Sequence, residues 1–203
     1  VYDEFVGYIH RHHPPRRSLD ESVPRGWSSY KSNGNETEAN TLLTNLMLQC
    51  EQYPSLDYVL IERGYQQTLG DWISPAEQFG ASLRSVVDTI KKTGKKPGIW
   101  LAPFIASPDS AIFKQHPDWF VHNVDGRPLR ADEVTYAGLD GKSCYVLDMT
   151  NLDVQEYMSN LISYMRQELG IELFKLDGCY WGTIKGRRHS VGITSIEAYR
   201  MGL

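Results

Sequence analysis

The chain has 203 residues, of which 41% are hydrophobic and 23% charged, and its formal net charge is −4. Such a composition is typical of a globular domain with its own core, or of a piece of a larger one. The small negative charge, without a basic stripe, argues against a nucleic-acid partner, and no apolar run approaches the ~20 residues of a membrane span.

The first 24 residues have the character of a linker. They begin Val1-Tyr2-Asp3-Glu4, without a start Met or a signal-peptide pattern, which indicates an excised or processed segment. The cluster His10-Arg11-His12-His13 has no carboxylate or cysteine ligand at a matching spacing, and Pro14-Pro15 follows it. We therefore expect a linker over residues 1–24 and no metal site within it.

Three cysteines, Cys50, Cys144 and Cys179, are widely spaced along the chain. An odd number at such spacings indicates free thiols rather than a disulfide framework. Free thiols are typical of a reducing compartment, so we predict a cytoplasmic location.

From residue 25 onward, short apolar strands alternate with amphipathic helices. Strands are expected at 27–30, 58–61, 97–102 and 173–176, and helices at 39–50, 83–90 and 154–169. An insertion with a hairpin at Asp125-Gly126 and a short strand at 145–147 separates the third main strand from the last of these helices. Repeated strand–helix units with apolar strands predict a parallel sheet, either a barrel or a doubly wound sheet.

The ends of the strands favour the barrel. No glycine-rich phosphate loop follows any strand, which argues against dinucleotide binding. Polar or aromatic residues do recur where strands end: Ser28-Ser29-Tyr30, Glu62-Arg63, Trp100, Lys175 and Asp177. Because a (β/α)8 barrel places its chemistry at these ends, we predict an α/β fold in which residues 25–203 form about the first four βα units of a TIM barrel.

Lys175-Leu176-Asp177 is the most specific signal in the chain. Strand alternation puts Lys175 and Asp177 on one face, where the cation would help to keep the carboxylate ionised. An ionised carboxylate facing an anomeric carbon is the nucleophile of a retaining glycosidase. The spacing alone equally allows a structural ion pair that caps the strand.

Aromatic residues near the strand ends fit a sugar site. Gly70-Asp71-Trp72 lies in the loop after the second strand, and Trp100 ends the third. Aromatic faces suit the apolar C–H faces of sugar rings. Either tryptophan could equally pack under a loop.

Several segments together resemble the microbial α-galactosidases of glycoside hydrolase family 36. In chain order they are Arg25–Tyr30, Gly64–Gln66 with Gly70–Trp72, Pro97–Phe104, Ser110 with His116–Trp119, Tyr145–Asp148, Phe174–Asp177 and Thr194–Leu203. The resemblance covers residues 25 to 203. It implies a retaining α-glycosidase that acts on a carbohydrate, with no cofactor and no metal, and it leaves monomer and homo-oligomer both open.

The resemblance also implies roles for individual residues. Asp177 matches the nucleophile of the family, Lys175 a lysine that contacts the sugar, and Trp100 a tryptophan that lines the pocket. Lys142 lies where relatives place a basic substrate contact. The proton donor of the family is an Asp on a later barrel strand, beyond Leu203, so the chain alone is expected to be inactive.

One departure from the family concerns the end of the second strand. Where relatives have two Asp residues that accept hydrogen bonds from sugar hydroxyls, this chain has Glu62-Arg63. Glu62 can still accept such a bond, whereas Arg63 has only donors, so galactose specificity is in question. Either Arg63 pairs internally with Glu62 or Asp71, or it binds the carboxylate of an acidic sugar.

Two other functions are compatible with parts of the sequence. Lys175 at a strand end could form a Schiff base, as in some barrel aldolases. The Arg63 substitution could instead mark a degenerate barrel that binds sugars without turning them over. The glycosidase hypothesis accounts for the most motifs and is the one we adopt.

Overall fold

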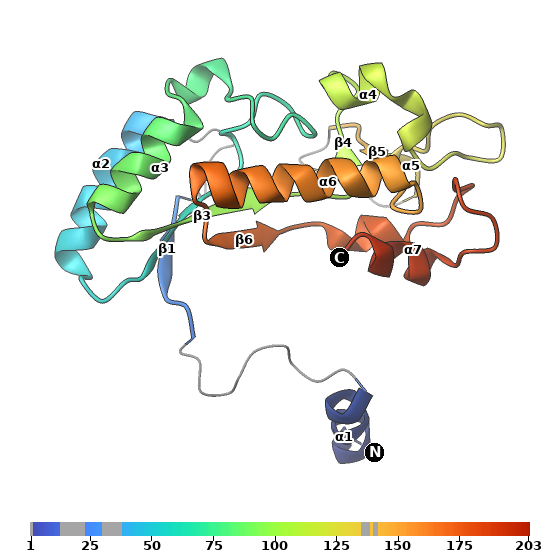
Figure 1. Cartoon of the computed structure of the whole chain (residues 1–203), viewed down its shortest axis with the longest axis horizontal. Coiled ribbons are helices and arrows are strands. Elements are labelled where there is room, and N and C mark those ends of the chain that lie inside the picture. The colour runs from blue at the N-terminus through green and yellow to red at the C-terminus, as the bar shows by residue number, and fades with distance from the viewer. Residues whose placement is uncertain (1, 13–22, 30–37, 135–138, 140–141) are drawn as a thin grey trace.

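Four parallel strands form the main sheet of the protein, in a computed structural model that describes residues 2–12, 23–29, 38–134, 139 and 142–203 (Figure 1). The strands are β1 (Gly26–Ser28), β2 (Tyr58–Ile61), β3 (Lys96–Leu101) and β6 (Leu173–Leu176), in the order β1-β2-β3-β6. Each strand pairs in parallel with the next one along the chain. This is the arrangement of the first strands of a (β/α)8 barrel, so the predicted fold class is confirmed.

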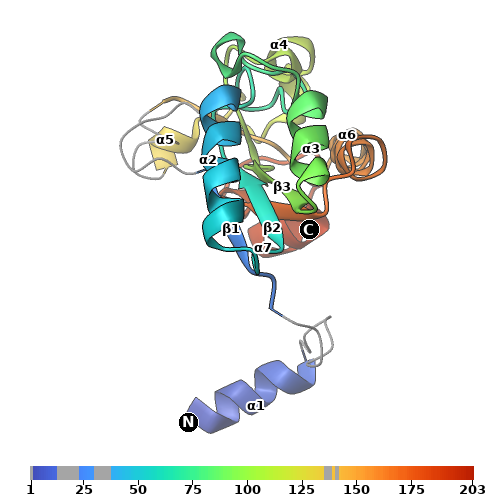
Figure 2. The same cartoon turned by 90° about the vertical axis from the view of Figure 1, so that its left-hand side faces the viewer.

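Three long helices connect these strands and lie along one side of the sheet. They are α2 (Ala39–Gln52), α3 (Leu83–Lys92) and α6 (Leu152–Tyr164), the last continuing as a π-helical segment, η3 (Met165–Leu169). Figure 2 shows α2 and α3 side by side in front of the strands, with α6 beyond α3. The sheet therefore has a face covered by helices and a face turned away from them.

The remaining helices stand at the periphery. They are α1 (Tyr2–His12), α4 (Ala111–Gln115), α5 (Ala131–Val134) and α7 (Ser195–Met201), with 3-10 turns η1 (Glu77–Phe79), η2 (Pro117–Trp119) and η4 (Cys179–Thr183). Helix α1 falls in the segment expected to be a linker, and none of its residues is buried. The division of the chain at residue 24 stays a prediction.

Local sequence explains where several helices begin. The hydroxyl of Ser82 accepts a hydrogen bond from Ser85 N at the start of α3, and Asn151 caps α6 through Asp153 N. At α7, Thr194 and Glu197 form a reciprocal capping box. Each of these side chains satisfies a backbone N–H that the helix itself leaves without a partner.

The helix-covered face of the sheet forms the core of the barrel unit. Val59 and Ile61 of β2 and Ile99 and Leu101 of β3 are each at most 2% exposed. The helices contribute Leu42, Leu46, Val86, Val87, Ile90, Val154 and Met165. The amphipathic helices expected at 83–90 and 154–169 thus bury an apolar face, whereas in α2, expected as an amphipathic helix over 39–50, the apolar Met47 is 53% exposed.

The insertion between β3 and α6 has a small sheet of its own and packs against the rest of the core. Strands β4 (Ile105–Ala106) and β5 (Tyr145–Val146) pair in antiparallel fashion within it. The predicted hairpin turn at Asp125-Gly126 is present, with Gly126 in the left-handed region and Asn123 N donating to Arg127 O. Tyr30, which the sequence places at the end of the first strand, lies outside the described residues.

The described part of the chain contains no group of three or more His, Cys, Asp or Glu side chains arranged to hold a metal ion. None of its helices combines the length and the apolar character needed to cross a membrane. All three cysteines are free, as the sequence predicted.

Candidate functional site

The strand register brings three predicted site residues, Glu62, Trp100 and Lys175, into one row at the carboxyl edge of the sheet, the strand-end row. Trp100 of β3 is the register partner of Lys175 of β6. Ile61 of β2 pairs with Ile99, so Glu62 follows at the level of Trp100. Because side chains alternate along a strand, all three lie on the face turned away from the helices, which in a closed barrel is the interior.

Asp177 follows β6 on the same face and is held through both carboxylate oxygens. Trp100 Nε1 donates to Asp177 Oδ2 over 3.0 Å, and Gly178 N donates to Oδ1 over 2.8 Å. The backbone N–H of Asp177 donates to Leu101 O, which extends the β3–β6 pairing by one residue. The carboxylate is therefore fixed by two different elements while the residue itself remains exposed.

Lys175 is paired with Glu62. Its Nζ lies 2.6 Å from Glu62 Oε1, and Ser28 Oγ donates to the same oxygen over 2.9 Å. The Glu62 side chain is 3% exposed, whereas that of Lys175 is 45% exposed. The sequence suggested Lys175 as the support of Asp177. In the structure the direct support of that carboxylate comes from Trp100, and Lys175 neutralises a buried glutamate.

The turn after Asp177 depends on glycine. Gly178 adopts a left-handed conformation with φ of 59°, which glycine reaches without steric cost. A Cβ at this position would also overlap the ring of Trp181. Next to it, burial and the Asp177 carboxylate together raise the pKa of the Cys179 thiol, so this thiol is a poor nucleophile near neutral pH.

The loop after β2 uses Asp71 and Trp72 in two different ways. The carboxylate of Asp71 accepts from Ala111 N, at the start of α4, and from Thr68 Oγ1. Trp72 is 1% exposed and packs edge-to-face against Trp100, with ring centroids 5.9 Å apart. In this structure both residues therefore shape the wall behind the strand-end row, and their predicted contact with substrate stays a prediction.

Arg63 and Lys142 line a separate cavity of about 200 Å³. Its other lining residues are mostly amides and hydroxyls, including Gln66, Gln67 and Ser107, and Asp109 is the carboxylate among its described lining residues. Both anions expected to pair with Arg63 have other partners: Glu62 is engaged by Lys175 and Ser28, and Asp71 by Thr68 and the α4 N-terminus. The structure brings Arg63 and Lys142 together, but not at the Asp177 carboxylate.

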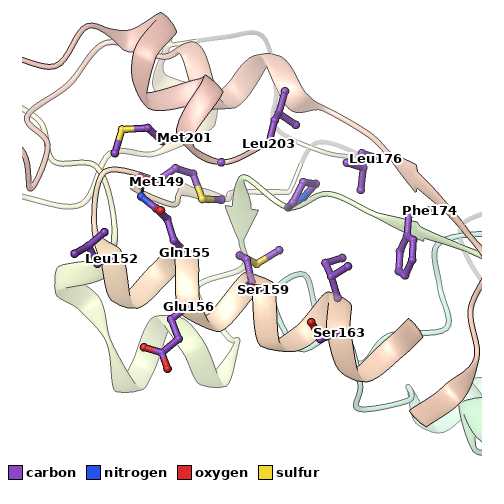
Figure 3. A pocket seen from close by; sticks show the side chains of 14 residues that line it. Met149, Leu152, Gln155, Glu156, Ser159, Ser163, Phe174, Leu176, Met201 and Leu203 are labelled. Atoms are coloured by element: carbon purple, nitrogen blue, oxygen red, sulfur yellow. Dashed lines mark hydrogen bonds between the residues drawn. The ribbon is translucent and has the colours of Figure 1, made fainter. Parts of the chain in front are cut away.

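A larger cavity, of about 750 Å³, lies on the other side of β6. Figure 3 shows it between side chains of α6, such as Leu152 and Ser159, and those of β6, with Met201 and Leu203 from the end of the chain. Its lining is largely apolar, and Phe174 and Leu176 belong to the face opposite to Lys175. This cavity is therefore part of the helix layer and not of the candidate site.

Two residues of the site were not predicted to belong to it. Ser28 contacts Glu62; the sequence marked it as a polar residue at a strand end, and its position on the same face as Glu62 was the signal for this contact. Tyr65 donates its hydroxyl hydrogen to Trp100 O over 3.1 Å and is 1% exposed. Nothing in its spacing signals that contact, since it arises from the path of the loop after β2.

Comparison with known proteins places these residues in a family context. The family model described as Melibiase matches residues 61–201. The α-galactosidase AgaA of Geobacillus stearothermophilus is 30% identical over 112 residues, which are 55% of this chain and 14% of that protein. α-Galactosidase 2 of Pediococcus pentosaceus is 23% identical over 192 residues, which are 93% of this chain and 24% of that protein.

Solved structures give the same match. TtGalA, an α-galactosidase from Thermus thermophilus in complex with p-nitrophenyl α-D-galactopyranoside, aligns with a TM-score of 0.71 at 30% identity, over 84% of this chain and 34% of that one. The α-galactosidase AgaB from Geobacillus stearothermophilus aligns with a TM-score of 0.70 at 21% identity, over 96% of this chain and 27% of that one. The chain thus spans about a third or less of the relatives that it matches.

Proposed function

Since the chain belongs to the Melibiase family, we propose that it forms the first half of the catalytic barrel of a retaining α-glycosidase that acts on terminal α-galactosides. The observation that carries this proposal is the strand-end row, in which Asp177 is held by Trp100 beside the Glu62–Lys175 pair. A relative of this fold has been solved with stachyose, which supports a carbohydrate substrate for this chain as well.

In the proposed reaction, an oxygen of Asp177 attacks the anomeric carbon as the glycosidic bond breaks, giving a covalent glycosyl–enzyme intermediate. The leaving oxygen takes a proton from a general acid, and water later cleaves the new ester with that same group acting as base. Following the resemblance, we assign the general acid to a carboxyl group on a later barrel strand. Glu62 is poorly suited to that task, because it is engaged by Lys175 and Ser28.

The remaining strand-end groups would position the sugar. Lys175 projects a partly exposed ammonium from the row, where it can donate to a sugar hydroxyl while it stays paired with Glu62. A lysine already bound to a carboxylate as an ammonium is not the free amine that a Schiff-base mechanism requires. The structure therefore gives the lyase hypothesis no support.

Covalent trapping tests the proposal. A protein that carries the whole barrel is incubated with an activated fluoro-galactoside, digested, and searched by mass spectrometry for the modified peptide. We expect the label on Asp177 and no label in the Asp177→Asn variant. Labelling of Asp71 or Asp148 would overturn the assignment. Tight binding of galactose without labelling or turnover would favour the alternative of a non-catalytic sugar-binding barrel.

A further inference from the structure

The carboxylate of Asp177 is connected to a buried tyrosine through two consecutive contacts. Trp100 Nε1 donates to Asp177 Oδ2 over 3.0 Å, and Tyr65 Oη donates to the carbonyl oxygen of Trp100 over 3.1 Å. We propose that Tyr65 is a positioning residue for the reaction: it fixes the end of β3 and thereby the indole that holds Asp177. This inference rests on the proposed function, since it takes Asp177 as the nucleophile.

The backbone geometry explains why the Trp100 carbonyl needs such a partner. Asp177 N donates to Leu101 O, so the carbonyl of Leu101 faces β6. Carbonyls of consecutive strand residues point in opposite directions, so the carbonyl of Trp100 faces β2. Strand β2 ends at Ile61, beside Ile99, and the Trp100 carbonyl lies beyond that end. The Tyr65 hydroxyl supplies the hydrogen bond there, in a buried position where a lost partner is costly.

Tyr65 is itself firmly held. Its ring packs edge-to-face against Phe79, with centroids 6.5 Å apart, and its carbonyl accepts from Ala76 N over 2.8 Å. Burial raises the pKa of the Tyr65 phenol well above its usual range, so the hydroxyl is protonated near neutral pH and can donate to the Trp100 carbonyl there.

The indole of Trp100 is restrained on its other sides as well. The ring of Trp72 packs against it at an interplanar angle of 65°, and both tryptophans are 1% exposed. Once Tyr65 fixes the backbone of Trp100, the indole N–H can point in few directions. One of these is toward Asp177 Oδ2. The second oxygen is set by Gly178 N, so the orientation of the carboxylate depends on the end of β3 together with the turn after β6.

Such a contact should matter more for the chemical step than for sugar binding. Attack on the anomeric carbon requires the carboxylate oxygen at a defined distance and angle, and small displacements of a reacting group reduce rates steeply. Tyr65 is buried behind Trp100, so it is not expected to touch the sugar. Loss of its hydroxyl should therefore lower the rate of covalent labelling and leave the affinity for the inhibitor unchanged.

The test is Tyr65→Phe in a protein that carries the whole barrel, with Tyr157→Phe as the matched control. Tyr157 makes the same kind of bond, from its hydroxyl to Gly70 O over 3.1 Å, but does not contact Trp100. We expect the maximal rate of labelling by the fluoro-galactoside to fall about tenfold in Tyr65→Phe only. The inhibitor concentration at half-maximal rate should stay constant, and both melting temperatures should fall by similar amounts.

Equal labelling rates in the two variants would overturn the role of Tyr65, whereas an unlabelled wild type would overturn the proposed function. Trp100→Phe provides a second test, since it removes the indole donor and keeps an aromatic ring. The double variant should then be labelled no more slowly than Trp100→Phe alone, because both residues act through one bond. Additive losses in the double variant would contradict the proposal.

Discussion

Two ion pairs that join distant parts of the described chain, Glu62–Lys175 and Asp148–Arg188, differ in how far water reaches them. At the strand ends, Lys175 and Glu62 are 2.6 Å apart, and the lysine side chain is 45% exposed. Between the insertion and the loop before α7, Arg188 and Asp148 are 3.3 Å apart, and their side chains are 4% and 2% exposed. The first pair leaves an ammonium available to a ligand, whereas the second is closed on both sides.

Hydrogen bonding separates the two pairs further. Asp148 also accepts from the backbone and hydroxyl of Thr150 and from His189 N, and Arg188 donates to the carbonyls of Gly182 and Ile184. That pair connects the insertion to the loop before α7 and has no obvious capacity left for a substrate. The comparison teaches that exposure of one partner, more than the charges themselves, distinguishes a group that can bind a ligand from one that holds the fold.

The largest expected effect is on stability, from breaking the closed pair. Arg188→Ala leaves the Asp148 carboxylate buried without its counter-charge, which costs about 3 kcal/mol of folding free energy. Urea unfolding of the purified protein measures this loss. The matched control is Arg127→Ala, since Arg127 and Asp125 are also 3.3 Å apart, but their side chains are 76% and 64% exposed.

An exposed pair of this kind contributes less than about 1 kcal/mol, so the control should unfold at nearly the wild-type urea concentration. If Arg188→Ala were no less stable than Arg127→Ala, burial would not be what distinguishes the two pairs. The activity of the folded molecules should change little in either variant, because both sites are structural.

Breaking the open pair should instead reduce activity. In a protein with the whole barrel, Lys175→Met removes the ammonium that would face the sugar, and we expect kcat/KM for an aryl α-galactoside to fall about a hundredfold. Stability should fall less than in Arg188→Ala. Glu62 is buried and loses its counter-charge, but Ser28 still donates to it and its Lys175 side is already 45% exposed to water. Lys96→Met is the control: this lysine pairs with Glu172 over 3.7 Å at the opposite end of the same strands.

Unchanged activity in Lys96→Met together with the loss in Lys175→Met would locate the function at the carboxyl ends of the strands. A loss of stability in Lys175→Met comparable to that in Arg188→Ala would contradict the distinction between an open, ligand-binding pair and a closed, structural one. It would make the Glu62–Lys175 pair structural too.

The sequence predicted the strand-end row because strand periodicity carries the information. Once 58–61, 97–102 and 173–176 are identified as parallel strands, Glu62, Trp100 and Lys175 must fall at the same edge and on the same face. The partners within that row were not predictable. Whether Lys175 reaches Asp177 or Glu62 depends on register across three strands and on the extra methylene of a glutamate, and neither is local.

Loop residues were less predictable for a related reason. The sequence placed Asp71 and Trp72 near the site, but a loop has no periodicity to show which side chain points where. Asp71 turns toward Ala111 N, and Tyr65, which was overlooked, turns toward Trp100. The burial of Asp148 was likewise invisible, because its partner Arg188 lies 40 residues further along the chain.

The smallest expected effect concerns Arg63, and it tests whether the comparison extends to a third charged group. Arg63 shares a cavity of about 200 Å³ with Lys142 and Asp109, and none of the strand-end residues Glu62, Trp100, Lys175 and Asp177 lines that cavity in the described part of the chain. In a protein with the whole barrel, Arg63→Gln should therefore change kcat/KM for a neutral aryl α-galactoside by less than about threefold.

The sharper alternative is that Arg63 binds the carboxylate of an acidic sugar, which its planar fork can hold through two parallel hydrogen bonds. A matched pair of aryl α-galactoside and aryl α-galacturonide distinguishes the two, with Arg63→Lys as the variant that keeps the charge and loses the fork. Preference for the neutral sugar in the wild type, unchanged in both variants, is the expected result. Preference for the galacturonide that falls in Arg63→Lys and further in Arg63→Gln would instead make Arg63 part of the sugar site and extend that site into the second cavity.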